Sequence, residues 1–137
     1  MSLILDSSAT LAWFYGDETT PAIRQVFELL IKDGAWVPSL WRLEVANILE
    51  IGVRRGRNDV AFLHATLADL SLLPISLDPE TDKHAWDTTL QLAHRHRLTL
   101  YDAAYLELAQ RRGFPLATLD GDLRRAAIAE GVHLLGM

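Results

Sequence analysis

The chain has 137 residues, half of them hydrophobic, and its eighteen acidic and thirteen basic side chains give a net charge of −5, which argues against broad nonspecific adhesion to nucleic acid. It contains no cysteine, so a disulfide framework and a thiolate metal site are both excluded. No apolar run approaches the roughly 18 residues of a membrane span, and we expect residues 1–137 to fold as a single cytoplasmic domain without membrane contact.

Short apolar stretches alternate with helical patterns in the first half of the chain. Strands are expected at 3–5 and 35–38, and helices at 7–15, 21–32, 40–54 and 58–70. The side chains expected to cap these helices at their N-termini are those of Ser7 or Ser8, Thr20 and Asn58, and Pro21 suits a first helical position. Each strand is therefore followed by helices.

The second half continues this alternation. An edge strand is expected at 73–77 because of Pro74, with further strands at 116–119 and 133–135 and helices at 79–95, 99–112 and 123–130. Thr99 is the expected cap of the 99–112 helix, and Gly113 ends it. Short apolar strands between helices predict an α/β fold, a three-layer α/β/α sandwich with a central, mainly parallel sheet.

Two aspartates directly follow predicted strands. Asp6 comes after the first strand, and Asp120 comes after the strand at 116–119. Parallel sheets bind ligands outside the carboxyl ends of their strands, so both carboxylates are expected at one edge of the sheet. Each residue also has a structural interpretation, since Asp6 could cap the following helix and Asp120 could form a turn with Gly121.

Two more acidic residues lie on predicted helices. Glu44 shares a helical stripe with mostly apolar residues, which sets it beside the core, although a boundary glutamate can also reach solvent through its flexible stem. Asp102 lies three residues after Thr99, at the spacing of a capping box, with Asp in place of the usual Glu. Its position also suits stabilisation of the carboxylate by the helix N-terminus.

Taken together, these four acids predict a metal site. Carboxylates that lie close together repel one another, and burial disfavours their charged forms further, so the cluster is costly without a cation. Oxygen ligands without cysteine, and without histidine at a ligand spacing, select Mg²⁺ or Mn²⁺ over Zn²⁺. Because Mg²⁺ typically binds carboxylates together with substrate phosphate, this chemistry points to phosphoryl transfer.

Eleven of the thirteen basic residues are arginine, and several are grouped, as in Arg54-Arg55-Gly56-Arg57. A guanidinium group binds phosphate or carboxylate in a bidentate manner, whereas lysine acts more as a point charge. Arginine near a helix C-terminus also complements the helix dipole, which accounts for part of this grouping.

Other enzyme classes fit the sequence poorly. A phosphoacceptor receiver domain would need an acidic pair near the first strand and a lysine near the phosphate, but the only lysines are Lys32 and Lys83, neither at a late strand end. The phosphate-loop and dinucleotide-binding glycine motifs are absent, as is the G-x-S-x-G motif of serine hydrolases. These absences leave the acidic cluster as the main chemical signal.

The stretches LILDSSA, VPSLWRLEVANIL and LTLYDAAYLELAQRRGFPLATLDGDL span nearly the whole chain in this order. In order and spacing they resemble PIN-domain ribonucleases, in particular the VapC toxins of bacterial VapBC toxin–antitoxin pairs. The resemblance implies that Asp6, Asp102 and Asp120 hold the metal. It gives Glu44 a role in binding metal or water and makes Asp122 an auxiliary candidate. Ser7 and Thr118 match polar positions that support such a site.

The resemblance implies a magnesium-dependent endoribonuclease, with Mn²⁺ as an alternative ion, in which metal-activated water attacks an RNA phosphodiester in line. It also implies a homodimer and a cognate VapB-type antitoxin, in a heterotetramer or larger assembly, with the antitoxin lying across the active-site groove. Two alternatives remain open, a PIN nuclease of RNA processing outside the toxin group and a binding module that has kept the fold without catalysis.

Overall fold

The computed structural model describes residues 1–137 and contains a five-stranded sheet flanked by helices. All four strand pairs are parallel, in the order β3-β2-β1-β4-β5. The strands are β1 (Leu3–Leu5), β2 (Ala35–Val37), β3 (Ile75–Leu77), β4 (Leu116–Ala117) and β5 (Leu134–Leu135). The predicted parallel sheet and the predicted edge position of β3 are thus confirmed.

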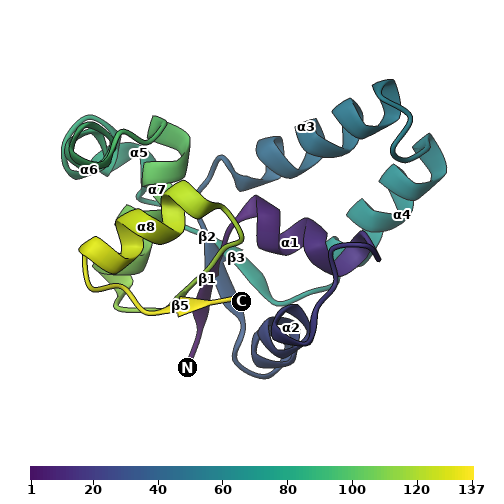
Figure 1. Ribbon diagram of the computed structural model, residues 1–137, viewed down its shortest axis with the longest axis horizontal. Coiled ribbons are helices and arrows are strands. Elements are labelled where there is room, and N and C mark those ends of the chain that lie inside the picture. The colour runs from purple at the N-terminus through teal and green to yellow at the C-terminus, as the bar shows by residue number, and fades with distance from the viewer.

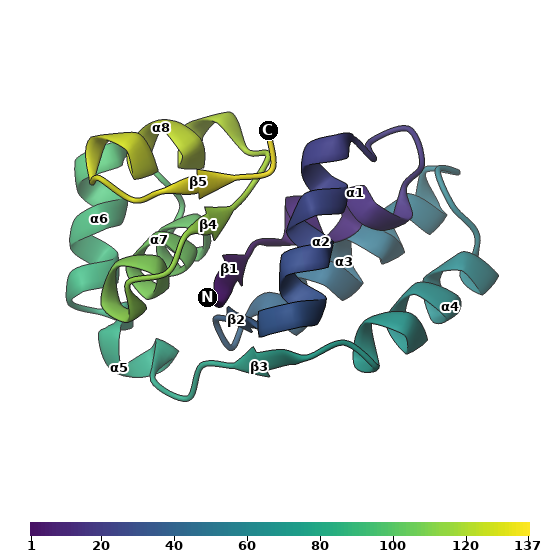
Figure 2. The same cartoon turned by 90° about the horizontal axis from the view of Figure 1, so that it is seen from below.

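Eight helices cover the two faces of this sheet. They are α1 (Ser7–Phe14), α2 (Pro21–Asp33), α3 (Trp41–Arg54), α4 (Val60–Ser71), α5 (Thr81–Ala85), α6 (Thr88–His96), α7 (Leu100–Arg112) and α8 (Gly121–Ala129). Helices α1–α4 lie on one side of the strands and α5–α8 on the other (Figures 1 and 2). This arrangement is the predicted α/β/α sandwich, and none of its helices is long and apolar enough to cross a membrane.

The sheet is buried because both of its faces are covered. Leu3, Ile4 and Leu5 of the central strand β1 are almost completely inaccessible to solvent, as are Leu116 and Ala117 of β4. Continuous apolar strands of this kind are typical of parallel sheets between two helical layers. The single core cluster extends from this sheet into both layers.

Several helix ends differ from the sequence expectation. Asp6, and neither Ser7 nor Ser8, caps α1, since its side chain accepts a hydrogen bond from the backbone of Ala9. Asp59 caps α4, where Asn58 was predicted. Asn58 is unavailable for this role because its side chain accepts a hydrogen bond from the Tyr15 hydroxyl and donates to the carbonyl of Leu49.

Two helices also have different bounds. The helix predicted at 79–95 is divided into α5 and α6 by Trp86 and Asp87, and Asp87 adopts a non-helical backbone conformation (φ −120°, ψ −104°). Asp87, Thr88 and Thr89 are all weak helix formers, so little local preference opposes this break. Helix α8 begins at Gly121 with Asp120 as its cap, two residues earlier than expected.

Candidate active site

Asp6 and Asp120 lie at the same edge of the sheet, as the sequence predicts. Strands β1 and β4 are adjacent and parallel, with Leu5 opposite Ala117. Asp6 follows β1 directly, and Asp120 follows β4 after two further residues. The parallel pairing therefore brings together two carboxylates that are more than a hundred residues apart in the sequence.

The Asp6 carboxylate is buried and held by three donors. Only 4% of the residue is exposed, and its side chain accepts hydrogen bonds from the backbone N–H of Ala9 (2.8 Å), Ser8 Oγ (2.7 Å) and Thr118 Oγ1 (2.5 Å). Burial raises the pKa of Asp6 from 3.8 to about 6, although these hydrogen bonds oppose the shift. Ser8 Oγ also lies 3.0 Å from the second carboxylate oxygen, so each oxygen of Asp6 faces two donors.

Asp102 lies in the first turn of α7, and its carboxyl group is in hydrogen-bond contact with that of Asp120. Thr99 Oγ1 caps the helix by accepting from the Asp102 backbone N–H at 3.1 Å, but the Asp102 side chain makes no return bond, so the capping box is only half formed. Partial burial, together with the negative charges of Asp120, Glu44 and Asp6, raises the pKa of Asp102 to about 6. Asp102 therefore lies within electrostatic range of the other three predicted acids.

Glu44 joins this cluster from the first turn of α3. Its Oε1 atom accepts a hydrogen bond from the Tyr105 hydroxyl at 2.6 Å, and Ser7 Oγ lies 3.5 Å from the same atom. Only 1% of Tyr105 is exposed, and burial beside Glu44 raises the pKa of its phenol above the ordinary value. Tyr105 therefore remains protonated and acts as a fixed donor that orients the Glu44 carboxylate.

Thr118 supports both strand-end aspartates, as expected from its position. Its buried hydroxyl donates to Asp6 and accepts a hydrogen bond from the backbone N–H of Asp120 at 3.0 Å. Asp120 in turn caps α8 by accepting from the backbone of Asp122 at 3.2 Å. The Asp122 side chain is exposed and pairs with Arg125 at 3.0 Å, so the chain provides it with its own cation.

Two contributors to the site did not emerge from the sequence. Ser8 Oγ donates to Asp6 and accepts from the backbone N–H of Leu119, which links the ends of β1 and β4. Tyr105 reaches Glu44 from three residues beyond Asp102, a spacing that puts both side chains on one face of α7. The helical spacing from Asp102 is the sequence signal that indicates Tyr105, whereas the sequence indicates Ser8 only as a helix cap.

The chemistry of the donor set fits a hard divalent cation. Asp6, Asp102, Asp120 and Glu44 supply carboxylate oxygens, and the raised pKa values of Asp6 and Asp102 mark a shortage of positive charge. No three acidic or histidine side chains lie at the spacing of a formed metal site. Carboxylates repel one another, and a divalent cation bound among them would relieve this repulsion.

Known proteins share this fold and sequence pattern. The PIN domain family model matches residues 3–129. Ribonuclease VapC3 of Pyrobaculum aerophilum is 35% identical over 131 residues, which cover 90% of this chain and 92% of that protein. The crystal structure of PAE2754 from Pyrobaculum aerophilum superposes with a TM-score of 0.67 at 27% identity, covering 98% of this chain and 83% of the other.

Proposed function

Because the chain belongs to the PIN domain family, we propose that it is a metal-dependent endoribonuclease, the toxin component of a type II toxin–antitoxin system, with residues 1–137 as one PIN domain. The observation that carries this proposal is the acidic cluster. Asp6 and Asp102 are buried or half-buried without a cationic partner, and burial raises the pKa of both. A bound divalent ion is the partner that would hold them ionised at neutral pH.

We assign the metal to Asp6, Asp102 and Asp120, with Glu44 binding either the metal or the attacking water. When bound, Mg²⁺ or Mn²⁺ supplies Lewis-acid polarisation of a phosphate and lowers the pKa of coordinated water. The protein contributes orientation. Ser8 and Thr118 fix the Asp6 carboxylate, and Tyr105 fixes one oxygen of Glu44, which leaves its second oxygen available to accept a proton from water.

The proposal includes a VapB-type antitoxin and self-association. Its structural support is an apolar groove of about 410 Å³ along α3, α4 and β3, lined mainly by the hydrophobic side chains of Trp41, Val45, Leu67, Leu70 and Leu73. Leu77 at its end is 41% exposed. An apolar groove that opens to solvent is a place where an apolar side chain of a protein partner could be buried. Light scattering of the purified protein, alone and with the product of an adjacent short reading frame, measures both associations.

The catalytic proposal is tested by cleavage of a structured RNA in the presence of Mg²⁺ or Mn²⁺. We expect cleavage that stops on addition of EDTA and returns with excess metal. Asp6→Asn and Asp102→Asn should each lower the single-turnover rate at least a thousandfold, equivalent to about 4 kcal/mol of transition-state stabilisation. Asp122→Asn is the matched control and should leave the rate unchanged, because its side chain faces solvent. Robust cleavage in EDTA would contradict the proposal.

A further inference from the structure

Helices α1 and α3 pack side by side (Figure 1), and side chains of both helices line a groove. It encloses about 400 Å³ and is lined in part by Ser7, Leu11, Tyr15, Ile48, Ile51 and Arg55. Ser7 and the neighbouring Ser8 of this lining also contact the acids, Ser7 at Glu44 and Ser8 at Asp6. The groove therefore adjoins the candidate active site through these two serines.

One stripe of α3 forms a wall of this groove. Glu44, Ile48, Ile51 and Arg55 follow one another at spacings of four, three and four residues, which puts them on one face of the helix. With a rise of 1.5 Å per residue, Arg55 lies about 16 Å from Glu44 along the helix axis. The stripe begins at an acid of the cluster, continues as apolar surface and ends at a cation.

The cation at the far end has no partner in the protein. Arg55 is exposed, and its guanidinium group makes no hydrogen bond or ion pair, whereas Arg54 pairs with Glu50 at 3.4 Å. Arg57 also lines the groove but is already bound by Asp17 at 3.1 Å and Glu18 at 2.8 Å. Arg55 is thus the free positive charge of the groove in a chain whose net charge is −5.

We propose that the α1–α3 groove is a subsite for the RNA strand that extends from the cleaved bond, and that Arg55 binds one of its backbone phosphates. This proposal rests on the proposed ribonuclease function. A guanidinium group suits a phosphate because it offers several donors in one plane. Ile48 and Ile51 form the apolar part of this wall, against which the sugar or base between the two ends can lie.

The subsite recognises the backbone and not the base sequence. The one aromatic ring in its lining, that of Tyr15, is stacked on Phe62 and covered by the guanidinium group of Arg57 at 4.0 Å. This ring has no free face on which a base could stack. Phosphate contacts position a strand without reading its sequence, so the subsite contributes affinity that depends on substrate length and on salt.

The test compares Arg55→Gln with Arg54→Gln, two neighbouring substitutions that change the net charge equally. Binding of a fluorescently labelled single-stranded RNA of about 12 nucleotides is measured by anisotropy at several salt concentrations, with Asp102→Asn present in every protein so that the RNA stays intact. Arg55→Gln should weaken binding about fivefold and reduce the slope of log K against log salt by about 0.7, the value for one lost contact to a single strand. Arg54→Gln should change neither quantity.

A second measurement uses cleavage by proteins with all four acids intact. For the RNA of about 12 nucleotides, Arg55→Gln should raise KM about fivefold, as expected for one lost phosphate contact, and should leave kcat unchanged. For a dinucleotide substrate, neither KM nor kcat should change. Equal binding and KM for the two arginine variants would overturn the subsite. Absence of cleavage by every protein, with RNA binding still dependent on Arg55, would contradict the ribonuclease proposal alone, so the two failures are distinguishable.

Discussion

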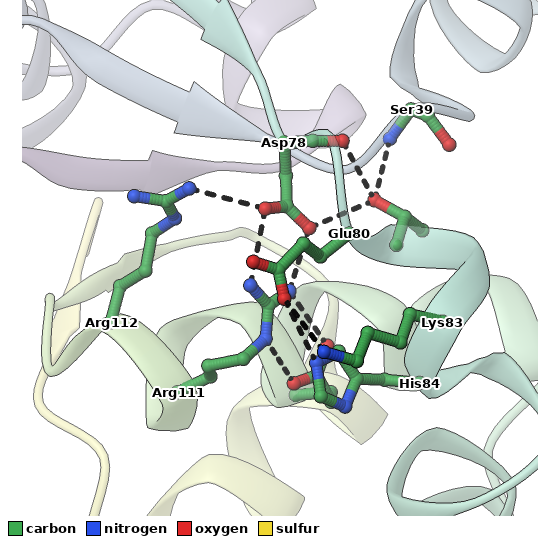
Figure 3. A network of polar contacts seen from close by, with 9 residues as sticks. Ser39, Asp78, Glu80, Lys83, His84, Arg111 and Arg112 are labelled. Carbon is green, nitrogen blue, oxygen red and sulfur yellow. Dashed lines mark hydrogen bonds and ion pairs between the residues drawn. The ribbon is translucent and has the colours of Figure 1, made fainter.

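The protein contains two clusters of carboxylates, one without a cationic partner and one paired with arginine. At the acidic cluster, Asp6 and Asp102 have no cation nearby, and burial raises the pKa of each to about 6. In the second cluster, where Asp78 follows β3, arginines of α7 supply the positive charge (Figure 3). Asp6 and Asp78, which directly follow β1 and β3, are both buried, so burial alone does not distinguish a functional acid from a structural one.

At Asp78 the chain supplies its own cations, although Arg112 Nε is buried without a hydrogen-bond partner. The Asp78 carboxylate contacts Arg111 Nη2 at 2.6 Å and Arg112 Nη2 at 3.2 Å, and Thr81 Oγ1 donates to it at 3.1 Å. Burial raises the pKa of Asp78, but the hydrogen bonds from Arg111 and Arg112 outweigh it and lower the pKa to about 2. Arg111 also binds Glu107 at 2.7 Å, one turn earlier in α7.

The presence or absence of a cationic partner indicates which buried acids are candidates for function. Where the chain provides its own cation, as at Asp78, the carboxylate stabilises the fold and has no need of a ligand. Where the chain provides none, as at Asp102, the unmet charge is itself a signal that something else binds there. The two clusters should therefore differ in their contribution to stability and in their dependence on metal.

The largest expected change in stability is at the paired cluster. Arg111→Met keeps the length of the side chain but leaves Glu107 without its partner and Asp78 with only Arg112, so we expect a loss of about 3 kcal/mol in the free energy of unfolding. Urea denaturation measures it. Arg125→Met removes an exposed pair with Asp122 and should cost less than about 0.5 kcal/mol. If the two variants lost equal stability, the paired cluster would have no special structural role.

The pH dependence of the metal-free protein should report the acidic cluster. Its fold favours the protonated forms of Asp6 and Asp102, so their contribution to stability is fully present below about pH 4 and is lost as the pH rises through about 6. We expect the free energy of unfolding to fall by about 2 kcal/mol between pH 5 and pH 7.5, and millimolar Mg²⁺ to restore it at the higher pH. Urea denaturation at each pH, with EDTA or Mg²⁺, checks this.

Two carboxylates that pair with cations, Glu130 and Asp78, do not contribute to the expected change between pH 5 and pH 7.5. Hydrogen bonds from His96 and Arg95 lower the pKa of Glu130 to about 2, and the arginine pairs hold that of Asp78 at about 2 despite its burial. The stabilisation from these two groups is present above about pH 4.5 and is lost only as the pH falls towards 2. A stability that stayed flat or rose from pH 5 to 7.5 in EDTA would contradict the difference between the clusters.

The smallest expected effect concerns Asp120. Asp120→Asn removes a negative charge that raises the pKa of Asp102, while the amide oxygen can still cap α8. Without metal, we expect its thermal stability to equal or exceed that of the wild-type protein by up to about 1 kcal/mol. Differential scanning calorimetry in EDTA measures this. A clear loss of stability would favour the purely structural role of Asp120 as a turn and helix cap.

Much of the fold follows from local sequence. The strands are short apolar runs that have little alternative, and Thr20, Thr99 and Gly113 mark helix ends where the structure has them. Local signals fail where neighbours compete. Asn58 and Asp59 are both good helix caps. Asp59 caps the helix because the Asn58 side chain already accepts a hydrogen bond from the hydroxyl of Tyr15, which is distant in the sequence.

The candidate site can be predicted in part from the sequence. Asp6 and Asp120 follow from the rule for parallel sheets, whereas for Glu44 and Asp102 the residues alone left structural and functional interpretations open. Contacts between segments that are distant in the sequence cannot be predicted in this way. Tyr105 and Glu44 are 61 residues apart, and Arg111 and Asp78 are 33 apart, and no local pattern specifies either contact.

The central claim is that the unpaired acids form a divalent-cation site. Calorimetric titration of the metal-free protein with Mn²⁺ at pH 7.5 tests it most directly, with Asp102→Asn and the control Asp122→Asn measured alongside. We predict saturable binding to the wild-type and Asp122→Asn proteins, and binding at least tenfold weaker to Asp102→Asn, a difference of about 1.4 kcal/mol or more. No saturable binding to the wild-type protein, or equal affinity in all three, would contradict the claim.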